Sequence, residues 1–131
     1  MFSGRIPAHI GWPLALFTCP DTEHWREPID LTGPARVIMY GPYLHLPAGQ
    51  WVARVEFEID GAISGVEAAT DVFISGSVVE KTFLMPTKGI FAFEIGFSVS
   101  DPRHTVEIRL MTKRSAIEGQ LLVRSVVVRP G

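Results

Sequence analysis

Apolar and polar side chains alternate along much of the chain, most clearly between residues 51 and 60. Five apolar residues there occupy every second position: Trp51, Ala53, Val55, Phe57 and Ile59. Only a period of two places such a set on one face, so the pattern predicts a strand with one buried and one largely solvated face. The preceding segment, 46–50, contains a proline that fixes φ and a glycine that can take positive φ. Residues 36–60 are therefore predicted to form a β-hairpin.

The same alternation or β-branched composition recurs after residue 60 and predicts further strands. They are expected at 69–75 and 78–85, which would pair as a hairpin, and at 91–99, 105–112 and 120–129. In the last of these the apolar register changes phase, so a β-bulge is expected near Arg124 and Ser125. The pattern predicts an all-β fold, an antiparallel β-sandwich of the jelly-roll kind with about eight strands.

The first 34 residues lack either period and contain five of the ten prolines. They are nevertheless too apolar for a disordered tail, so they are expected to form an irregular arm that packs over a sheet or its edge. Short strands are expected at 6–10 and near 29–31, and Asp21 is a candidate N-cap for one helical turn. The chain is predicted to be a single domain, 1–131, with the arm at 1–34 and the sandwich strands at 35–131.

Composition excludes several classes of function. Twelve basic and fourteen acidic residues give a net charge of −2, and the basic residues form no stripe, so nucleic acid is not expected as a partner. The one cysteine, Cys19, cannot form an internal disulfide. No apolar run is long enough for a secretory core or a membrane span, which favours a soluble, cytoplasmic protein. The hydrophobic fraction of 47% fits either a sandwich with two buried faces or a surface covered by a partner.

Several motifs resemble those of a group of bacterial domains found in or beside glycosyltransferases and other polysaccharide-related proteins. They lie at residues 27–33, 40–43, 46–51, 106–109 and 116–119. The layout is also similar to the galactose-binding-like jelly rolls, which include many carbohydrate-binding modules. The resemblance implies a non-catalytic carbohydrate-binding domain or an accessory domain of a glycan-processing protein.

Sugar recognition needs an aromatic face for the C–H side of a pyranose and planar polar groups for its hydroxyls. The candidate ligand-binding residues are Tyr40, Tyr43, Trp25, His45, Arg54 and Arg109. The alternative for the two tyrosines is that they pack inward with their hydroxyls bonded to the backbone. Trp25 has polar neighbours and is expected at the surface, whereas Trp12 and Trp51 are expected in the core.

No cofactor is expected. The four histidines share no short spacing, which argues against a transition-metal site. A structural calcium ion could use oxygens of Asp21, Glu23 or Asp30, although solvated loop acids explain the same residues.

The sequence is not expected to be that of an enzyme. Glycoside hydrolysis would need paired carboxylates, and the candidates, Glu56 with Glu58 or Glu94 with Glu107, fall on outward strand positions. No nucleophile elbow or P-loop occurs. The alternative to carbohydrate binding is a protein-interaction or oligomerisation module whose apolar arm, 2–17, packs against a second copy or a larger protein.

Overall fold

The structure, a computed structural model, describes residues 10–22, 27–61 and 66–131. Its regular elements are one 3-10 turn, η1 (Leu14–Leu16), and nine strands: β1 (Ile10–Trp12), β2 (Ile29–Asp30), β3 (Val37–Leu44), β4 (Gly49–Asp60), β5 (Glu67–Ile74), β6 (Ser77–Leu84), β7 (Gly89–Val99), β8 (Val106–Thr112) and β9 (Gln120–Pro130). No helix in the described part of the chain is long and apolar enough to cross a bilayer. The predicted all-β fold is confirmed, with nine strands in place of about eight.

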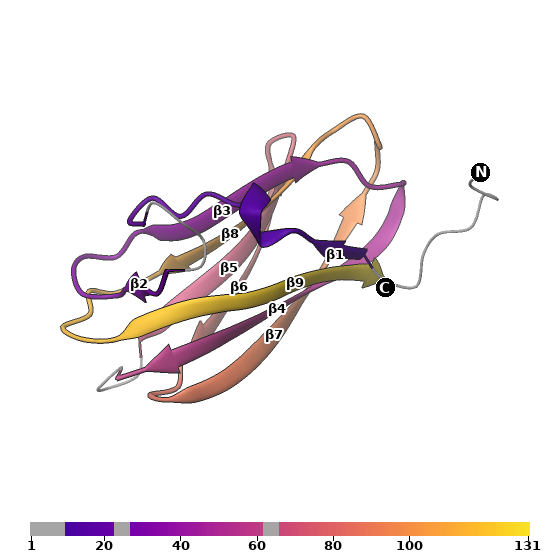
Figure 1. Ribbon diagram of the computed structural model, residues 1–131. Coiled ribbons are helices and arrows are strands. Elements are labelled where there is room, and N and C mark those ends of the chain that lie inside the picture. Colours follow the sequence, from indigo (N-terminus) through magenta and orange to yellow (C-terminus); the bar gives the residue numbers. More distant parts are fainter. Residues whose placement is uncertain (1–9, 23–26, 62–65) are drawn as a thin grey trace.

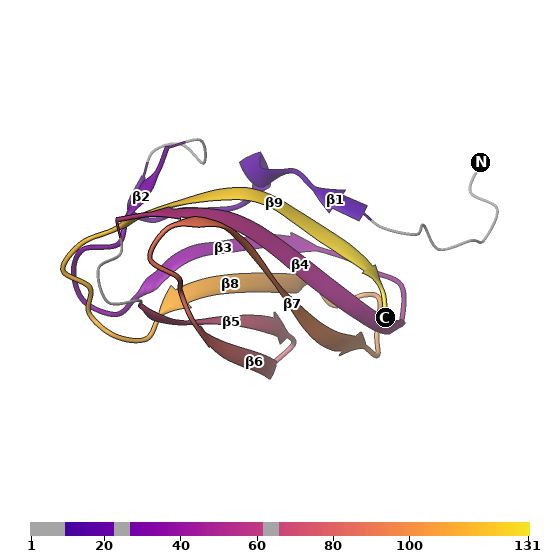
Figure 2. The ribbon, with the colours of Figure 1, turned by 90° about the horizontal axis from the view of Figure 1, so that it is seen from below.

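The strands form two antiparallel sheets that lie face to face (Figures 1 and 2). The first sheet has the order β1-β9-β4-β7, and β2 also pairs with β9. The second sheet has the order β3-β8-β5-β6. Each sheet buries one face against the other, so the prediction of an antiparallel sandwich is confirmed.

β4 is the central strand of the first sheet and follows the predicted alternation. Its odd-numbered side chains from Trp51 to Ile59 are at most 1% exposed, whereas the even-numbered ones from Val52 to Glu58 are half-buried on the outer face. The strand pairs with β7 over nearly its whole length and with β9 on its other side. Trp51 also donates a hydrogen bond of 2.8 Å from Nε1 to the carbonyl oxygen of Pro47, which satisfies its buried ring nitrogen.

The predicted hairpin over 36–60 is wrong. The chain does reverse direction between β3 and β4, and Gly49 has the expected positive φ, but β3 pairs with β8 in the second sheet. The connection therefore crosses from one sheet to the other, with Leu46 buried beneath it. Turn chemistry specifies a reversal and does not specify which strand becomes the hydrogen-bonding partner.

Two other predictions about pairing are confirmed. β5 and β6 form a hairpin in which Ile74 lies opposite Ser77. In the ladder between β4 and β9, Glu56 pairs with Ser125 and Phe57 pairs with Val123, so Arg124 is the extra residue of a bulge. The bulge lets apolar residues of odd and even register on β9 face the same core.

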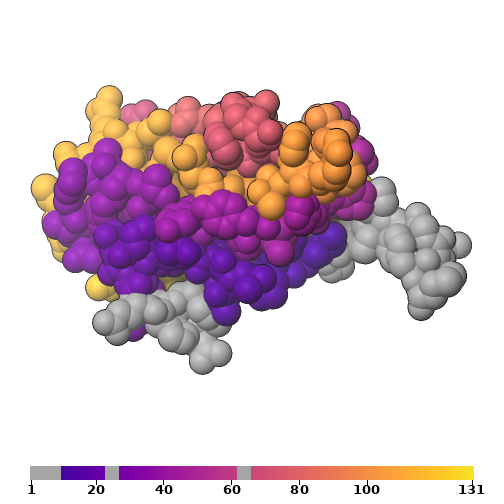
Figure 3. Space-filling model, turned by 90° about the horizontal axis from the view of Figure 1, so that it is seen from above, coloured from indigo at the N-terminus to yellow at the C-terminus, as the bar shows by residue number. Residues whose placement is uncertain are grey.

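The described part of the arm, from Ile10 onward, closes one side of the sandwich. β1 adds to the edge of β9, and Thr18 then exchanges two backbone hydrogen bonds of 2.8 and 2.9 Å with Tyr40 on β3. The arm thus spans both sheets, with Trp12 and Phe17 buried, and Figure 3 shows it against β3. The strand expected at 6–10 is described only from Ile10 onward; the preceding residues lie outside the described ranges.

The opposite side of the sandwich, between β6 and β7, is packed by aromatic rings at one end. Phe83 of β6 lies 4.6 Å from Phe93 of β7 and 6.1 Å from Phe57 of β4, measured between ring centroids. Lys81 of β6 donates a hydrogen bond of 2.9 Å to the carbonyl oxygen of Glu94. These contacts attach the edge strand of the second sheet to the first sheet.

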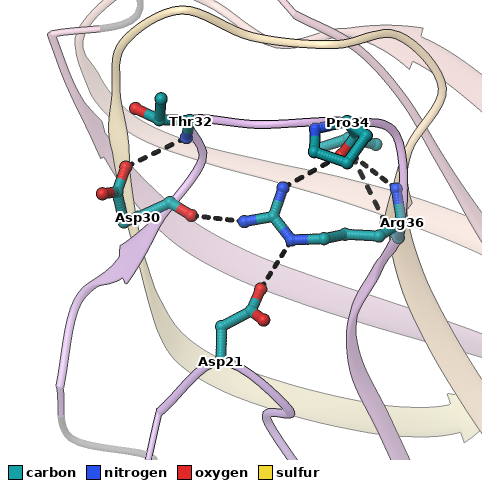
Figure 4. A network of polar contacts seen from close by, with 6 residues as sticks. Asp21, Asp30, Thr32, Pro34 and Arg36 are labelled. Atoms are coloured by element: carbon teal, nitrogen blue, oxygen red, sulfur yellow. Dashed lines mark hydrogen bonds and ion pairs between the residues drawn. The ribbon is translucent and has the colours of Figure 1, made fainter.

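Arg36 attaches the segment around β2 to the start of β3 (Figure 4). Its guanidinium donates hydrogen bonds to the carboxylate of Asp21 (2.6 Å) and to the carbonyl oxygens of Asp30 (2.6 Å) and Pro34 (3.0 Å). Asp21 was expected to cap a helical turn; residues 23–26 of that turn lie outside the described ranges, and the Asp21 carboxylate pairs with Arg36.

We expect Arg36→Lys to lower the free energy of unfolding by about 1–2 kcal/mol, because an ammonium group cannot reach three acceptors arranged around a planar fork. Chemical denaturation of the two proteins measures the change. Arg114→Lys is the matched control, since Arg114 is 79% exposed and pairs only with Glu67 at the surface. Equal stability of Arg36→Lys and the parent protein would contradict this role.

Candidate functional site

The outer face of the second sheet carries a cluster of polar and aromatic side chains. On β8, Glu107 and Arg109 alternate with buried residues and therefore point outward. Across the ladders, Arg109 lies between Tyr40 of β3 and Asp71 of β5, and Glu107 lies beside Phe73 of β5. Three strands that are not consecutive in sequence thus bring these side chains together.

A half-buried ion pair fixes the centre of this cluster. Arg109 donates from Nε and Nη2 to the two carboxylate oxygens of Asp71, at 2.7 and 2.6 Å, in the fork geometry that gives strong pairing. Asp71 is only 3% exposed although it lies on the outer face. The hydrogen bond to Asp71 raises the pKa of Arg109 above its usual value. The guanidinium also lies 5.6 Å from the ring centroid of Phe73, a cation–π contact.

Tyr43 is placed by a bulge in β3. Pro42 pairs with Glu107 and Leu44 pairs with Val106, so Tyr43 is the extra residue between them. Its φ of 64° is in the left-handed region, which side-chain-bearing residues rarely adopt, and such bulges redirect a side chain. The ring is 50% exposed. A hydrogen bond to the Glu107 carboxylate, aided by burial and by the nearby negative charge, raises the pKa of Tyr43 to about 12.

An open hollow of about 470 Å³ lies over this end of the second sheet. It is lined by Tyr43, Phe73, Ser75, Arg103, His104, Thr105 and Glu107. The β5–β6 turn and the β7–β8 loop, side by side in Figure 3, form its rim. We call it the first hollow. It combines an exposed aromatic ring with hydroxyl, carboxylate and guanidinium groups.

The structure brings three of the six sequence-predicted residues together and separates the others. Tyr40, Tyr43 and Arg109 share the outer face of the second sheet. His45 follows β3, and its Nδ1 donates a hydrogen bond of 3.0 Å to the carbonyl oxygen of Pro102. Arg54 is on the outer face of the first sheet, 3.7 Å from Glu56, so its predicted place beside the tyrosines is wrong. Trp25 lies outside the described residues.

Sequence reasoning missed Asp71, Phe73 and the β7–β8 loop residues Arg103 and His104. Asp71 could have been found, because a carboxylate within an apolar, β-branched run needs a partner when the strand is buried. The loop residues carry no comparable signal, since only the fold places them beside Phe73.

The acids considered for calcium binding are engaged elsewhere. Asp21 pairs with Arg36, and the carboxylate of Asp30 accepts a hydrogen bond from the backbone nitrogen of Thr32 (2.9 Å), which lowers the pKa of Asp30. Glu23 lies outside the described residues. Within 10–22, 27–61 and 66–131, no three His, Cys, Asp or Glu side chains converge as ligands of one ion.

The carboxylate pairs considered for hydrolysis do not form a site. Glu94 is on the outer face of the first sheet and Glu107 on that of the second, so they cannot flank one glycosidic bond. Glu56 and Glu58 face outward together, and both lie near Arg124, at 3.6 and 3.4 Å.

Solved structures provide the comparison with known proteins. No protein-family model matches the sequence, and no curated protein matches it. The structure of TmCBM61 in complex with β-1,4-galactotriose matches with a TM-score of 0.57 at 12% identity, covering 94% of this chain and 87% of that one. A family 16 carbohydrate-binding module matches with a TM-score of 0.52 at 11% identity, covering 76% and 74%. This chain has the jelly-roll fold of carbohydrate-binding modules. The expected resemblance to galactose-binding-like jelly rolls is confirmed at the level of fold.

We expect Asp71→Asn to lower the free energy of unfolding by about 2 kcal/mol, because a neutral amide cannot accept both guanidinium bonds and leaves Arg109 with only the more distant Glu107 carboxylate, at 4.0 Å, among the described residues. Asp101→Asn is the control, since its partner Arg103 is 87% exposed and the pair is screened by water. Chemical denaturation measures both variants. An equal loss of unfolding free energy in Asp71→Asn and Asp101→Asn would show that the Asp71–Arg109 pair has no special role in stability.

The phenol of Tyr43 should ionise near pH 12 in the folded protein, and Glu107→Gln should move that ionisation back toward its ordinary value of 10.0. A raised pKa means that folding favours the neutral phenol, so this contribution to stability is complete below pH 10 and is lost as pH rises to about 12. Ultraviolet titration measures phenolate formation. The difference between the parent protein and Tyr43→Phe gives the part of the signal that comes from Tyr43. An unchanged titration in Glu107→Gln would show that the two groups do not interact.

Proposed function

We propose that this chain is a non-catalytic carbohydrate-binding module that holds a sugar ring against Tyr43 in the first hollow. The observation that carries the proposal is the exposed Tyr43 ring, held by a bulge beside polar groups that are already fixed in place. The jelly-roll fold, which carbohydrate-binding modules share, supports it.

The chemistry of the hollow suits a sugar. A pyranose has an apolar C–H face, which can pack on Tyr43, and a rim of hydroxyls that both donate and accept hydrogen bonds. The Glu107 carboxylate can accept from those hydroxyls and the Arg103 guanidinium can donate to them. Ser75 and Thr105 add two more hydroxyl groups at the rim.

A binding role fits the acids better than a catalytic one. Asp71 pairs with Arg109, and the Glu107 carboxylate lies beside Tyr43, whose pKa it raises. Among the described residues that line the hollow, Glu107 is the single carboxylate, whereas glycoside hydrolysis needs two. We therefore infer an accessory role beside a glycan-processing protein.

The alternative of an oligomerisation module that uses the arm receives less support. Trp12 and Phe17, its largest described apolar side chains, are 4% and 6% exposed because they pack on the chain's own core. They are therefore not available to a second copy without unfolding the arm.

A glycan array that includes β-1,4-linked galacto-oligosaccharides should show selective binding by the purified protein. Titration calorimetry with a bound glycan should then show an affinity loss of about tenfold or more in Tyr43→Ala, because the stacking surface is gone. Arg54→Ala is the matched control on the opposite face and should bind as the parent does. A blank array from folded protein, or equal losses in both variants, would refute the proposal.

A further inference from the structure

A second hollow of about 180 Å³ lies next to the first, at the same end of the sandwich. It is where the β5–β6 turn meets the end of β7. Apolar side chains of Val72, Ile74, Val79 and Phe97 line it, together with Ser75, Ser77, Ser98, Ser100 and His104. Tyr43, on which the proposed sugar site depends, lines the first hollow and not the second.

The second hollow exists because of a change in residue size along the seam between β6 and β7. At one end of the seam, Phe83, Phe91 and Phe93 are large enough to fill the space between the two sheets. At the other end, the inward positions of β6 are Val79 and Ser77, opposite Val72 and Ile74 of β5, and they are too small to fill the space beside Phe97 of β7. The seam is therefore closed by phenylalanine rings at one end and left open beside Ser77 at the other, the serine end.

The two hollows adjoin each other, since Ser75 and His104 line both of them. Ser75 is in the β5–β6 turn with a positive φ of 45°, and His104 is in the β7–β8 loop with a half-exposed ring. A ligand lying on Tyr43 would therefore have to pass only these two residues at the shared rim to reach the second hollow.

We propose that the second hollow is a subsite for an adjoining sugar residue, so that the protein binds an oligosaccharide chain of at least two residues in preference to a monosaccharide. This inference rests on the proposed function of the first hollow. An apolar lining with a rim of hydroxyls and an imidazole matches a sugar ring, which is apolar on its face and polar at its edge.

The volumes agree with this arrangement. A cavity of about 150 Å³ accommodates benzene, so an open hollow of about 180 Å³ has room for the apolar face of one sugar ring whose hydroxyl groups stay at the rim. The first hollow, at about 470 Å³, is more than twice as large and leaves room for a ring on Tyr43 and its substituents.

Calorimetric titration with the mono-, di- and trisaccharides of β-1,4-linked galactose and of β-1,4-linked glucose tests the subsite. We expect affinity to rise about tenfold or more from the monosaccharide to a longer member of a series that binds, because a second ring adds contact at little extra cost in lost translational freedom. Tyr43→Ala should weaken binding at every length.

Ser77→Trp should remove the gain with chain length while leaving monosaccharide affinity within about twofold, because the indole fills only the second hollow. Ser77 is exposed at the start of β6, where a strand accepts a large aromatic residue. Ser100→Trp, from the opposite rim, is a second variant that blocks the same space. Ala92→Trp is the control: Ala92 is exposed on β7, roughly 20 Å along the strand from Ser98.

The outcomes separate the two proposals. Absence of binding by either series at any length, together with a blank glycan array, would overturn both. Equal affinity for mono-, di- and trisaccharides, with binding lost in Tyr43→Ala, would overturn the subsite and leave the proposed function standing. A gain with length that survives in both folded serine variants, or that Ala92→Trp also removes, would likewise overturn the subsite.

Discussion

Burial of alternate β4 side chains is the constraint on which the rest of the structure depends. β4 is paired on both sides, by β7 and β9, so a shift of its register by one residue would turn its odd-numbered side chains from Trp51 to Ile59 toward water. The core can therefore form on one side of this sheet only, and the second sheet must cover that side. The inner face of the second sheet packs on this core, so its outer face is left accessible to solvent. The arm covers the side next to β3, which leaves the outer face and the serine end of the seam accessible.

The outer face of the second sheet is ordered before any ligand binds, and the Asp71–Arg109 pair is the reason. A free arginine side chain loses rotamer freedom when it contacts a ligand, and that loss weakens binding. Arg109 has already lost this freedom to a carboxylate that is 3% exposed and to the ring of Phe73. The bulge in β3 restricts Tyr43, the extra residue between the pairs Pro42–Glu107 and Leu44–Val106. Ligand binding at such a face would cost less side-chain conformational entropy than binding at a surface whose side chains move independently.

The sequence predicts the elements of this fold better than their partners. Alternation locates β4, β7 and β8, and the phase change in β9 locates its bulge, because both signals are local. The partner of β3 is not a local property: a turn at 46–50 suits a hairpin and a crossing between sheets equally well. The same limit explains the error for Arg54. The outward position of Arg54 follows from alternation, but alternation does not specify which of the two sheets carries the strand. The pairing of β3 with β8 puts Tyr43 on the same outer face as Arg109, whereas Arg54 is on the outer face of the other sheet.

The charges around the first hollow also favour one chemical class of ligand over another. Each basic side chain there has an acidic partner: Arg109 pairs with Asp71, Arg103 with Asp101, and Lys113, at the far end of the same face, with Glu80 at 2.8 Å. Glu107 adds a carboxylate to the centre. Paired charges keep their hydrogen-bonding directions but produce little net field at a distance. A polyanionic chain would gain no long-range attraction and would meet Glu107 at close range, whereas a neutral chain of hydroxyl groups would find both donors and acceptors. The face is therefore suited to uncharged sugars.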